Sequence, residues 1–442
     1  MRRIAVLAVV YLLAGFTVVR AEEGVTNDTI RIGAHGPLTG PAAFVGLGSR
    51  AGMQLAVQEI NAAGGINGRK LEVLYEDDGN SPAKALAAVK KLVEQDRVFM
   101  VLGLSASNPT IGVLDYLKEV KVPGYFSIAS APQITHPFNR YLFRGAATES
   151  ARYGELYSEF LTQFLQVKRV AILSSTDENG KNEGDNLTRY LAKWYNIKPL
   201  TRQEFKLGDK DFTPQLLQAK STDPEVIVLD TAAPEAAIII RQGRELGIRV
   251  PFFGGGATVD NALIAADGYL AEGFMGPWSV PLFPDSEDPA MTKFRESWTK
   301  LNPNPPKGRP NLFDLWSYGD TYDIAEGLRR AGPDLTREKF VDALETLDAY
   351  RVSEVASPRS FDEMAPYRQL PDAYHGRARP ALGPACVDAN ASERDPQRFE
   401  KGLSGATRVR GVSRAAGHPL SDRLHDMSSR GNPYDNARQK AS

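Results

Sequence analysis

Small residues that follow two buried apolar runs can do binding chemistry in this chain. Ser105 and Ser107 come after the run at 98–102, and Ala129 and Ser130 come after the run at 122–127. Because ligands of parallel sheets bind beyond the carboxyl ends of strands, hydroxyls and backbone N–H groups at these positions can hold a small charged group. Each serine also has a local explanation. Ser107 can cap a helix that begins before Pro109, and Ser130 can be a turn residue.

Motifs typical of enzymes are weak in this sequence. Residues 46–52 read G-x-G-x-x-x-G, which differs by one residue from the dinucleotide fingerprint and begins too far beyond its strand. Ser81 and Lys84 have the Ser-x-x-Lys spacing without its companion motifs, and a helix cap accounts for Ser81. The acidic run at 76–78 can bind a cation or lie solvated at a strand end. No G-x-S-x-G, H-E-x-x-H or P-loop motif occurs, so we expect a protein that is not an enzyme.

Composition excludes further classes of site. The 442 residues are 42% hydrophobic and carry a formal net charge of -1, so the chain is long enough for two globular domains and its charge gives no reason to expect nucleic acid as a partner. Cys386 is the single cysteine, which excludes an intramolecular disulfide and a cysteine-rich zinc site. With five histidines in the whole chain, we expect no metal and no cofactor.

A strand–helix–strand unit opens the globular part of the chain. Residues 29–34 form a β-rich run, residues 40–48 form a glycine-rich loop, and apolar residues recur at helical spacing from Ser49. Residues 71–75 then alternate as a second strand, so the connection between the strands should be right-handed. The glycine-rich loop follows the carboxyl end of the first strand, and it is where we expect a binding site.

Strands and helices go on alternating to about residue 347, which predicts parallel sheets with helices on both faces. Further strands are expected at 98–102, 122–127, 169–173, 200–205, 226–229, 250–253 and 273–278, and further helices at 82–95, 109–119, 149–167, 186–195, 212–220, 234–246, 260–266, 289–300, 312–330 and 336–347. Residues 140–146 are expected to cross to a second set of elements. The repeated order of elements before and after about residue 146 predicts two doubly wound α/β lobes.

Both ends of the chain differ from this pattern. Residues 1–21 are typical of a signal peptide, since Arg2-Arg3 precedes an apolar run that is too short to span a membrane. We therefore expect export to the periplasm. Residues 357–442 form an irregular tail, and residues 427–437 resemble a short motif of insertion-sequence transposases. We hypothesise a gene truncated by a mobile element, and the alternative is a natural disordered extension.

Three motifs of the opening stretch support a family assignment. They read G-P-L-T-G-P at 36–41, A-V-Q-E-I-N-A-A-G-G-I-N-G-R-K-L at 56–71 and E-D-D-G-N-S-P at 76–82. Residues 26–347 resemble the substrate-binding proteins of bacterial ABC importers, in the family for branched-chain and other hydrophobic amino acids. That resemblance implies a type I periplasmic binding fold with a ligand cleft between two lobes. Lobe one would comprise 27–147 and 281–348, and lobe two would comprise 148–280.

The resemblance also implies a function. The protein would be a monomer that captures an amino acid, or a related small acid or amide, and delivers it to the membrane subunits of an ABC permease. A ligand sensor of the same fold that signals to a membrane partner is the alternative. Closing the lobes would remove water from the ligand and strengthen its polar contacts.

Site residues follow from the resemblance, position by position. In lobe one they are Phe44, Val45 and Phe313 for apolar contacts, and Ser105, Ser107, Ala129 and Ser130 for the polar end of the ligand. In lobe two the matching positions hold Asn179, Ala233 and Gly256, where the family often has two aromatic residues and an acid that neutralises the ligand ammonium. Burying an ammonium group without that acid costs free energy. Either Asp230 or Asp260 substitutes for the acid, or the ligand lacks the amine.

Overall fold

Parallel strands form the centre of both lobes. The computed structural model describes residues 22–147, 149–259, 263, 271, 273–303, 310–348 and 355–356. The strands of the five-stranded lobe are β1 (Thr29–Gly36), β2 (Lys70–Asp77), β3 (Met100–Gly103), β4 (Gly124–Phe126) and β5 (Leu142–Arg144). Those of the four-stranded lobe are β6 (Val170–Ser175), β7 (Thr201–Phe205), β8 (Val226–Asp230) and β9 (Phe252–Gly254). Their orders are β2-β1-β3-β4-β5 and β7-β6-β8-β9, with every pair parallel. The prediction of parallel α/β sheets is confirmed.

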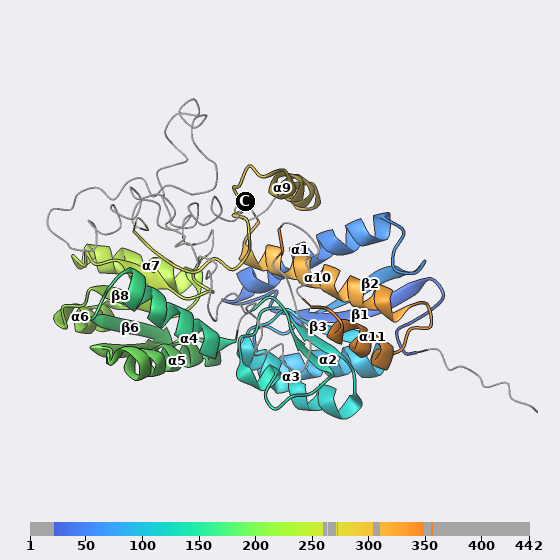
Figure 1. Cartoon of the computed structure of the whole chain (residues 1–442), viewed down its shortest axis with the longest axis horizontal. Helices are drawn as coiled ribbons and strands as arrows, with labels where there is room; N and C mark the ends of the chain where they lie inside the picture. The colour runs from blue at the N-terminus through green and yellow to red at the C-terminus, as the bar shows by residue number, and fades with distance from the viewer. Residues whose placement is uncertain are drawn as a thin grey trace, which may run out of the picture.

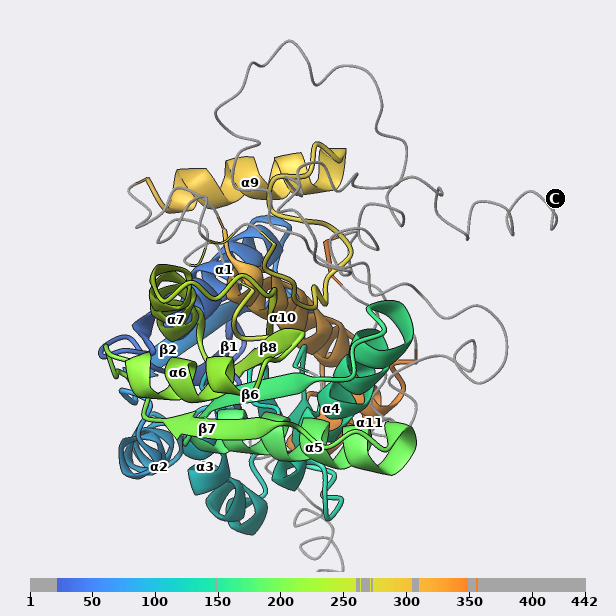
Figure 2. The same cartoon turned by 90° about the vertical axis from the view of Figure 1, so that its left-hand side faces the viewer.

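Helices cover both sheets. The five-stranded lobe has α1 (Ala43–Ala62), α2 (Pro82–Lys90) continued by the π-helix η1 (Lys91–Gln95), α3 (Ser107–Val120), the 3-10 turn η2 (Pro132–Ile134), α9 (Pro289–Leu301), α10 (Leu312–Ala331) and α11 (Arg337–Glu345). The four-stranded lobe has α4 (Ser150–Glu159) continued by the π-helix η3 (Phe160–Phe164), α5 (Glu178–Tyr195), α6 (Thr213–Ser221) and α7 (Ala233–Glu245). Figure 1 shows the green four-stranded lobe beside the five-stranded lobe, and Figure 2 looks onto the four-stranded lobe with α1 and α10 behind it.

The end of the described chain returns to the first sheet. Side chains of α9, α10 and α11 share one buried apolar cluster with β1, β3 and α1, and α10 packs directly along α1 (Figure 1). Gly52 of α1 makes this close approach possible, because a Cβ there would lie 1.9 Å from the carbonyl oxygen of Asp314. The five-stranded lobe is thus assembled from two segments of the chain, one before and one after the four-stranded lobe in the sequence. The exact lobe boundaries predicted from the sequence stay predictions.

The central strands are buried on both faces. All residues of β3, β6 and β8 are buried, as expected for parallel strands between two helical layers. Apolar side chains of β6 and β8 belong to two clusters, one on each face of the four-stranded sheet. Because side chains pack against both faces of the sheet, the carboxyl ends of its strands are held in place. The loops that line the site begin at these ends.

Three elements differ from the sequence-based expectation. Helix α1 begins at Ala43 and not at Ser49, because its early glycines serve close packing: a Cβ on Gly46 would lie 1.9 Å from the carbonyl oxygen of Pro37. Helix α5 begins at Glu178 and not at residue 186, since its first turns are polar and carry no apolar periodicity. Residues 142–144, expected in a crossing segment, form the edge strand β5, which is too short to show a period.

Other expectations are confirmed only in part or fall outside the described residues. Residues 273–278, expected as a strand, contribute a single bridge from Met275 to Phe253. The signal peptide at 1–21, most of the helix expected at 260–266 and the tail at 357–442 lie outside the described residues. Among the residues that are described, no helix is both long and apolar enough to cross a bilayer. In the same part of the chain, no group of three or more His, Cys, Asp or Glu side chains is placed to hold a metal ion.

Candidate functional site

A cavity lies between the two lobes, at the carboxyl ends of both sheets. Its volume is about 190 Å³, far above the roughly 10–15 Å³ that one water molecule needs. The five-stranded lobe contributes Pro41, Ala42, Phe44, Val45, Gly79, Asn80, Ala106, Ile128, Ser130, Ala147, Phe313 and Trp316. The four-stranded lobe contributes Tyr153, Ser175, Asp177, Asn179, Glu183, Leu207, Thr231, Ala232, Glu235, Gly256 and Ala257. A molecule in this cavity would therefore contact both lobes at once.

Four helices begin at the cavity wall. The N-cap residues of α1, α3, α5 and α7 are Ala42, Ala106, Asp177 and Ala232, and all four line the cavity. In a parallel sheet each strand leads into a helix at its carboxyl end, so the helix starts converge there. The first N–H groups of a helix have no partner within the helix, and its dipole favours negative charge. The cavity can therefore hold an anionic group such as a carboxylate.

Hydrogen bonds join the lobes across the cavity. The Ser130 hydroxyl donates to Asn179 Oδ1 at 2.7 Å, and both residues line the cavity. Near it the backbone N–H of Glu178 donates to Asn108 Oδ1 at 3.0 Å, which ties α5 to α3. Ser130 is thus engaged with the opposite lobe, a role that a simple turn residue does not have.

A buried arginine holds the loop that carries Ser130. Arg144 is 3% exposed, and its Nη1 and Nη2 donate to the carbonyl oxygens of Ala129 and Ala131 at 2.8 and 2.6 Å. Burial lowers the pKa of Arg144 to about 10, against the raising effect of the Glu149 carboxylate. The Ser130 carbonyl in turn accepts the N–H of Ser150, the first residue of α4. Three successive carbonyl groups of this loop are therefore fixed.

Six of the residues predicted from the sequence meet at the cavity. They are Phe44, Val45, Ser130, Asn179, Gly256 and Phe313. Phe44 and Val45 lie in the first turn of α1 and not in a loop, so the expectation of a loop is corrected. Phe44 also packs against Phe313 with ring centroids 5.8 Å apart, which forms one apolar wall.

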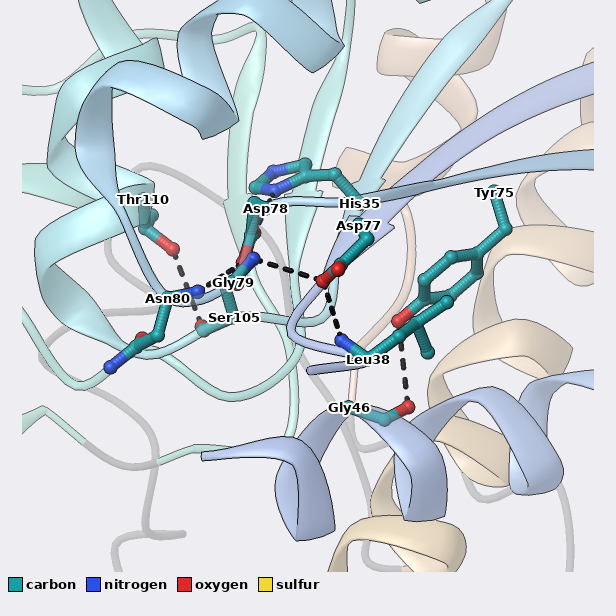
Figure 3. A network of polar contacts seen from close by, with 10 residues as sticks. All are labelled: His35, Leu38, Gly46, Tyr75, Asp77, Asp78, Gly79, Asn80, Ser105 and Thr110. Carbon is teal, nitrogen blue, oxygen red and sulfur yellow. Dashed lines mark hydrogen bonds and ion pairs between the residues drawn. The ribbon is translucent and has the colours of Figure 1, made fainter. Parts of the chain in front are cut away.

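The other four predicted residues lie behind the described cavity wall, and a ligand role for them stays a prediction. Ser105 is fully buried and its hydroxyl donates to Asp78, which also pairs with His35 Nδ1 at 2.8 Å (Figure 3). Ala129 is fully buried, and its carbonyl binds the arginine described above. Ala233 is buried at the first position of α7.

Ser107 is the fourth of these residues, and the capping role considered as the alternative for it is wrong. Helix α3 begins at Ser107 itself, its N-cap is Ala106, and Pro109 is the third helical residue. The hydroxyl of Ser107 is buried and has no hydrogen-bond partner among the described residues. Such a group costs free energy unless a partner arrives, and Ser107 begins a helix whose N-cap faces the cavity.

Sequence reasoning missed the acidic side of the cavity. Glu183, Glu235 and Asp177 line it, and none of them was predicted as a site residue. Glu183 lies four residues after Asn179 on α5 and accepts from its Nδ2 at 3.2 Å. The i,i+4 spacing would have found Glu183 had the helix been expected to begin at its true start.

Two buried carboxyl groups lie close together on this side. Burial raises the pKa of Glu183 well above its usual value, and the nearby Asp230 raises it further. Burial also raises the pKa of Asp230 to about 7, against the lowering effect of Arg202. Both oxygens of Asp230 lack a hydrogen-bond partner in the described part of the chain. Asp230 lies behind the cavity wall, while Asp260, the other acid considered from the sequence, is outside the described residues.

Comparisons with known proteins agree with this geometry. A family model described as periplasmic binding protein matches residues 29–369. The leucine-, isoleucine-, valine-, threonine- and alanine-binding protein of Pseudomonas aeruginosa is 27% identical over 343 residues, which are 78% of this chain and 88% of that protein. The leucine-specific-binding protein of Salmonella typhimurium is 25% identical and covers 80% of this chain and 92% of its own length. The structure of LivJ from Streptococcus pneumoniae in complex with isoleucine has 25% sequence identity and a TM-score of 0.67. The match covers 76% of this chain and 92% of that chain.

Proposed function

Because this chain belongs to the periplasmic binding protein family, we propose that it is the extracytoplasmic solute-binding protein of an ABC importer. It captures an amino acid, or a related small acid or amide, between its lobes and delivers that ligand to the membrane subunits of a permease. Similar proteins from Pseudomonas aeruginosa and Salmonella typhimurium are named for the amino acids they bind. This proposal extends that kind of ligand to the present chain and places the protein in the periplasm.

One observation carries the proposal. Helix starts from both lobes converge on one cavity, and they bring backbone N–H groups to it from opposite sides. Around it, the hydroxyls of Ser107 and Thr231 are buried without hydrogen-bond partners in the described part of the chain. Buried polar groups are normally satisfied. A ligand that forms hydrogen bonds with these hydroxyls would remove the free-energy cost of burying them unpaired, and its binding would favour closure of the lobes.

The site residues fit this role by position. Ser130 and the start of α3 would hold a ligand carboxylate, because a helix N-terminus stabilises an anion without a full opposing charge. Phe44, Phe313 and Trp316 offer apolar surface for the ligand's carbon chain. The four-stranded lobe would close over the ligand with Asn179 and Glu183.

A melting screen of the full chain tests binding. Amino acids, aromatic acids and amides are added singly at millimolar concentration, and the midpoint of thermal unfolding is measured. A ligand at 100 times its Kd stabilises the folded state by about 2.7 kcal/mol, so a true ligand should raise the midpoint by several degrees. The ligand should be recovered unchanged by mass spectrometry, whereas turnover would show an enzyme. If no compound of the screen raises the midpoint, the proposal of a solute-binding protein is wrong.

The transport step needs its own measurement. Uptake of the radiolabelled ligand by cells that carry the gene is compared with uptake by a deletion strain. An importer component predicts loss of high-affinity uptake in the deletion strain. Unchanged uptake would instead identify the protein as a sensor of the same fold.

A further inference from the structure

The wall of the cavity that belongs to the four-stranded lobe is acidic. Asp177, Glu183 and Glu235 all line it, and the described lining residues include no Lys, Arg or His. The opposite wall, from the five-stranded lobe, is formed mainly by apolar side chains such as Phe44, Ile128 and Trp316. A ligand that lies across the cavity therefore meets an apolar surface on one side and carboxylates on the other.

The negative charge of two of the three acids is stabilised by the helices on which they lie. Asp177 is the N-cap residue of α5, and Glu235 lies in the first turn of α7. Negative charge at a helix N-terminus is stabilised by the helix dipole. Asp177 also accepts from the Ser175 hydroxyl, and Glu235 accepts from the N–H of Gly208 at 3.0 Å. These two carboxylates therefore have compensation within the chain.

Glu183 has no such compensation. It is six residues into α5 from Asp177, is 2% exposed, and accepts one hydrogen bond, from the neutral Asn179 amide. A Cβ on Gly255 would lie 2.3 Å from Glu183 Oε2 and 3.6 Å from Asp230 Oδ1, so the two carboxyl groups approach the same point. Asp230 is fully buried with both oxygens unpartnered among the described residues. Burying two neighbouring carboxyl groups is costly unless a cation pairs with them, and the nearby Arg202 forms its ion pairs with Asp185 and Glu204 instead.

An unpartnered hydroxyl points to a ligand at the same wall. Thr231 follows Asp230 directly, is 2% exposed, and lines the cavity. Its Oγ1 has no hydrogen-bond partner within the described part of the molecule. A hydroxyl can accept as well as donate, so Thr231 can accept an N–H bond from a ligand group at this wall.

We propose that the ligand is a basic amino compound whose distal cation, an ammonium or guanidinium group, binds Glu183 at the wall backed by Asp230. This inference rests on the proposed function, because it takes the ligand's carboxylate to lie at Ser130 and the start of α3. Helix α3 has alanine as its N-cap residue and leaves its first N–H groups without a side-chain acceptor there. The far end of the ligand then faces the four-stranded lobe and its carboxylates.

Pairs of amino acids that differ in the distal charge test this assignment. Kd values of the full chain are measured by titration calorimetry for L-lysine against L-norleucine and for L-ornithine against L-norvaline. At least one basic member should bind about tenfold or more tightly than its neutral partner, as expected for a buried hydrogen bond to a charged group. Equal or tighter binding of the neutral members would overturn the inference and leave the proposed function standing.

Variants of one helix assign the effect to one residue. Glu183→Gln should abolish the preference for the basic member, and Glu183→Leu should reverse it in favour of norleucine. Glu178→Gln is the matched control on α5, since Glu178 does not line the cavity and binds Asn182 instead. Its preference should equal that of the unchanged protein. A Glu183 variant that folds, as judged by circular dichroism, and keeps the preference would overturn the inference.

The wider melting screen distinguishes failure of the cation subsite from failure of the proposed solute-binding function. If neither member of any pair binds while another compound of that screen does, the cation subsite is wrong and the solute-binding function stands. If nothing in either set binds, both proposals are wrong.

Discussion

Substitution of Asp230 by asparagine should change the pH dependence of stability in a defined direction. Asp230 is the last residue of β8 and is fully buried, and burial raises its pKa to about 7. In the unfolded chain an aspartate has its ordinary pKa of about 3.9. Between these values the folded protein keeps a proton that the unfolded chain has released. The folded state therefore binds more protons, and stability falls as the pH rises through this window.

The size of the effect follows from the two pKa values. Each pH unit inside the window costs about 1.4 kcal/mol, and above pH 7 the cost levels off because the folded carboxyl group also ionises. Relative to a pH below both pKa values, the free energy of unfolding is lower by about 1–2 kcal/mol at pH 5 and by roughly 4 kcal/mol at pH 8. Asp230→Asn should remove this loss, and it should also relieve the raising effect of Asp230 on the pKa of Glu183. Its effect on the free energy of unfolding should therefore be more favourable at pH 8 than at pH 5, by about 2 kcal/mol or more.

Urea unfolding of the ligand-free chain at the two pH values measures this difference. The buried asparagine amide leaves donors without partners, which costs about 1–3 kcal/mol, but this cost is the same at both pH values and cancels in the comparison. Asp115→Asn is the control, because the Asp115 side chain is 99% exposed and its substitution should have the same effect at pH 5 and pH 8. If Asp230→Asn changes stability equally at both pH values, or is less favourable at pH 8, the reasoning about its burial is wrong.

Three further substitutions test the structure around the cavity. Ser130→Ala removes the hydrogen bond between the lobes and should weaken ligand binding about fivefold by calorimetry; unchanged affinity would contradict the role of this contact in closure. Arg144→Met leaves two buried carbonyls without their donors and should lower the free energy of urea unfolding by about 2–4 kcal/mol; a loss below 1 kcal/mol would mean that water replaces the guanidinium. Gly52→Ala forces α1 away from α10 and should cost about 1–3 kcal/mol, whereas Gln54→Ala, on the exposed side of α1, should change little.

Much of the architecture was predictable from local patterns. Continuous apolar runs such as 98–102 and 226–229 predicted strands that are buried on both faces, and their alternation with helices predicted parallel sheets. Parallel topology places ligand-facing residues after the strands, which indicated Ser130, while Phe44 was found through the family resemblance. Their side-chain partners were not predictable, because Asn179 and Phe313 come from other elements of the chain.

Glycines and polar first turns were the main source of wrong boundaries. In isolation, a glycine lowers helix propensity by about 1 kcal/mol relative to alanine, so the start of α1 was expected to be a loop. Its glycines pack against backbone atoms of Pro37 and Asp314, and that packing outweighs the intrinsic cost. Likewise, the polar first turns of α5 hid the register that brings Glu183 to the cavity.

The sequence by itself indicated the family, through the motifs at 36–41, 56–71 and 76–82, and it indicated the alternation of strands and helices, through apolar residues at periods of two and 3.6. Parallel topology then predicted the sheet edges at which a ligand would bind. Tertiary structure alone decided which polar groups are already satisfied. Ser105 is bound to Asp78, whereas Ser107, Thr231 and Asp230 remain buried without partners within the described residues. The free energy of a polar group depends on which atoms approach it, and those atoms come from segments far apart in the chain.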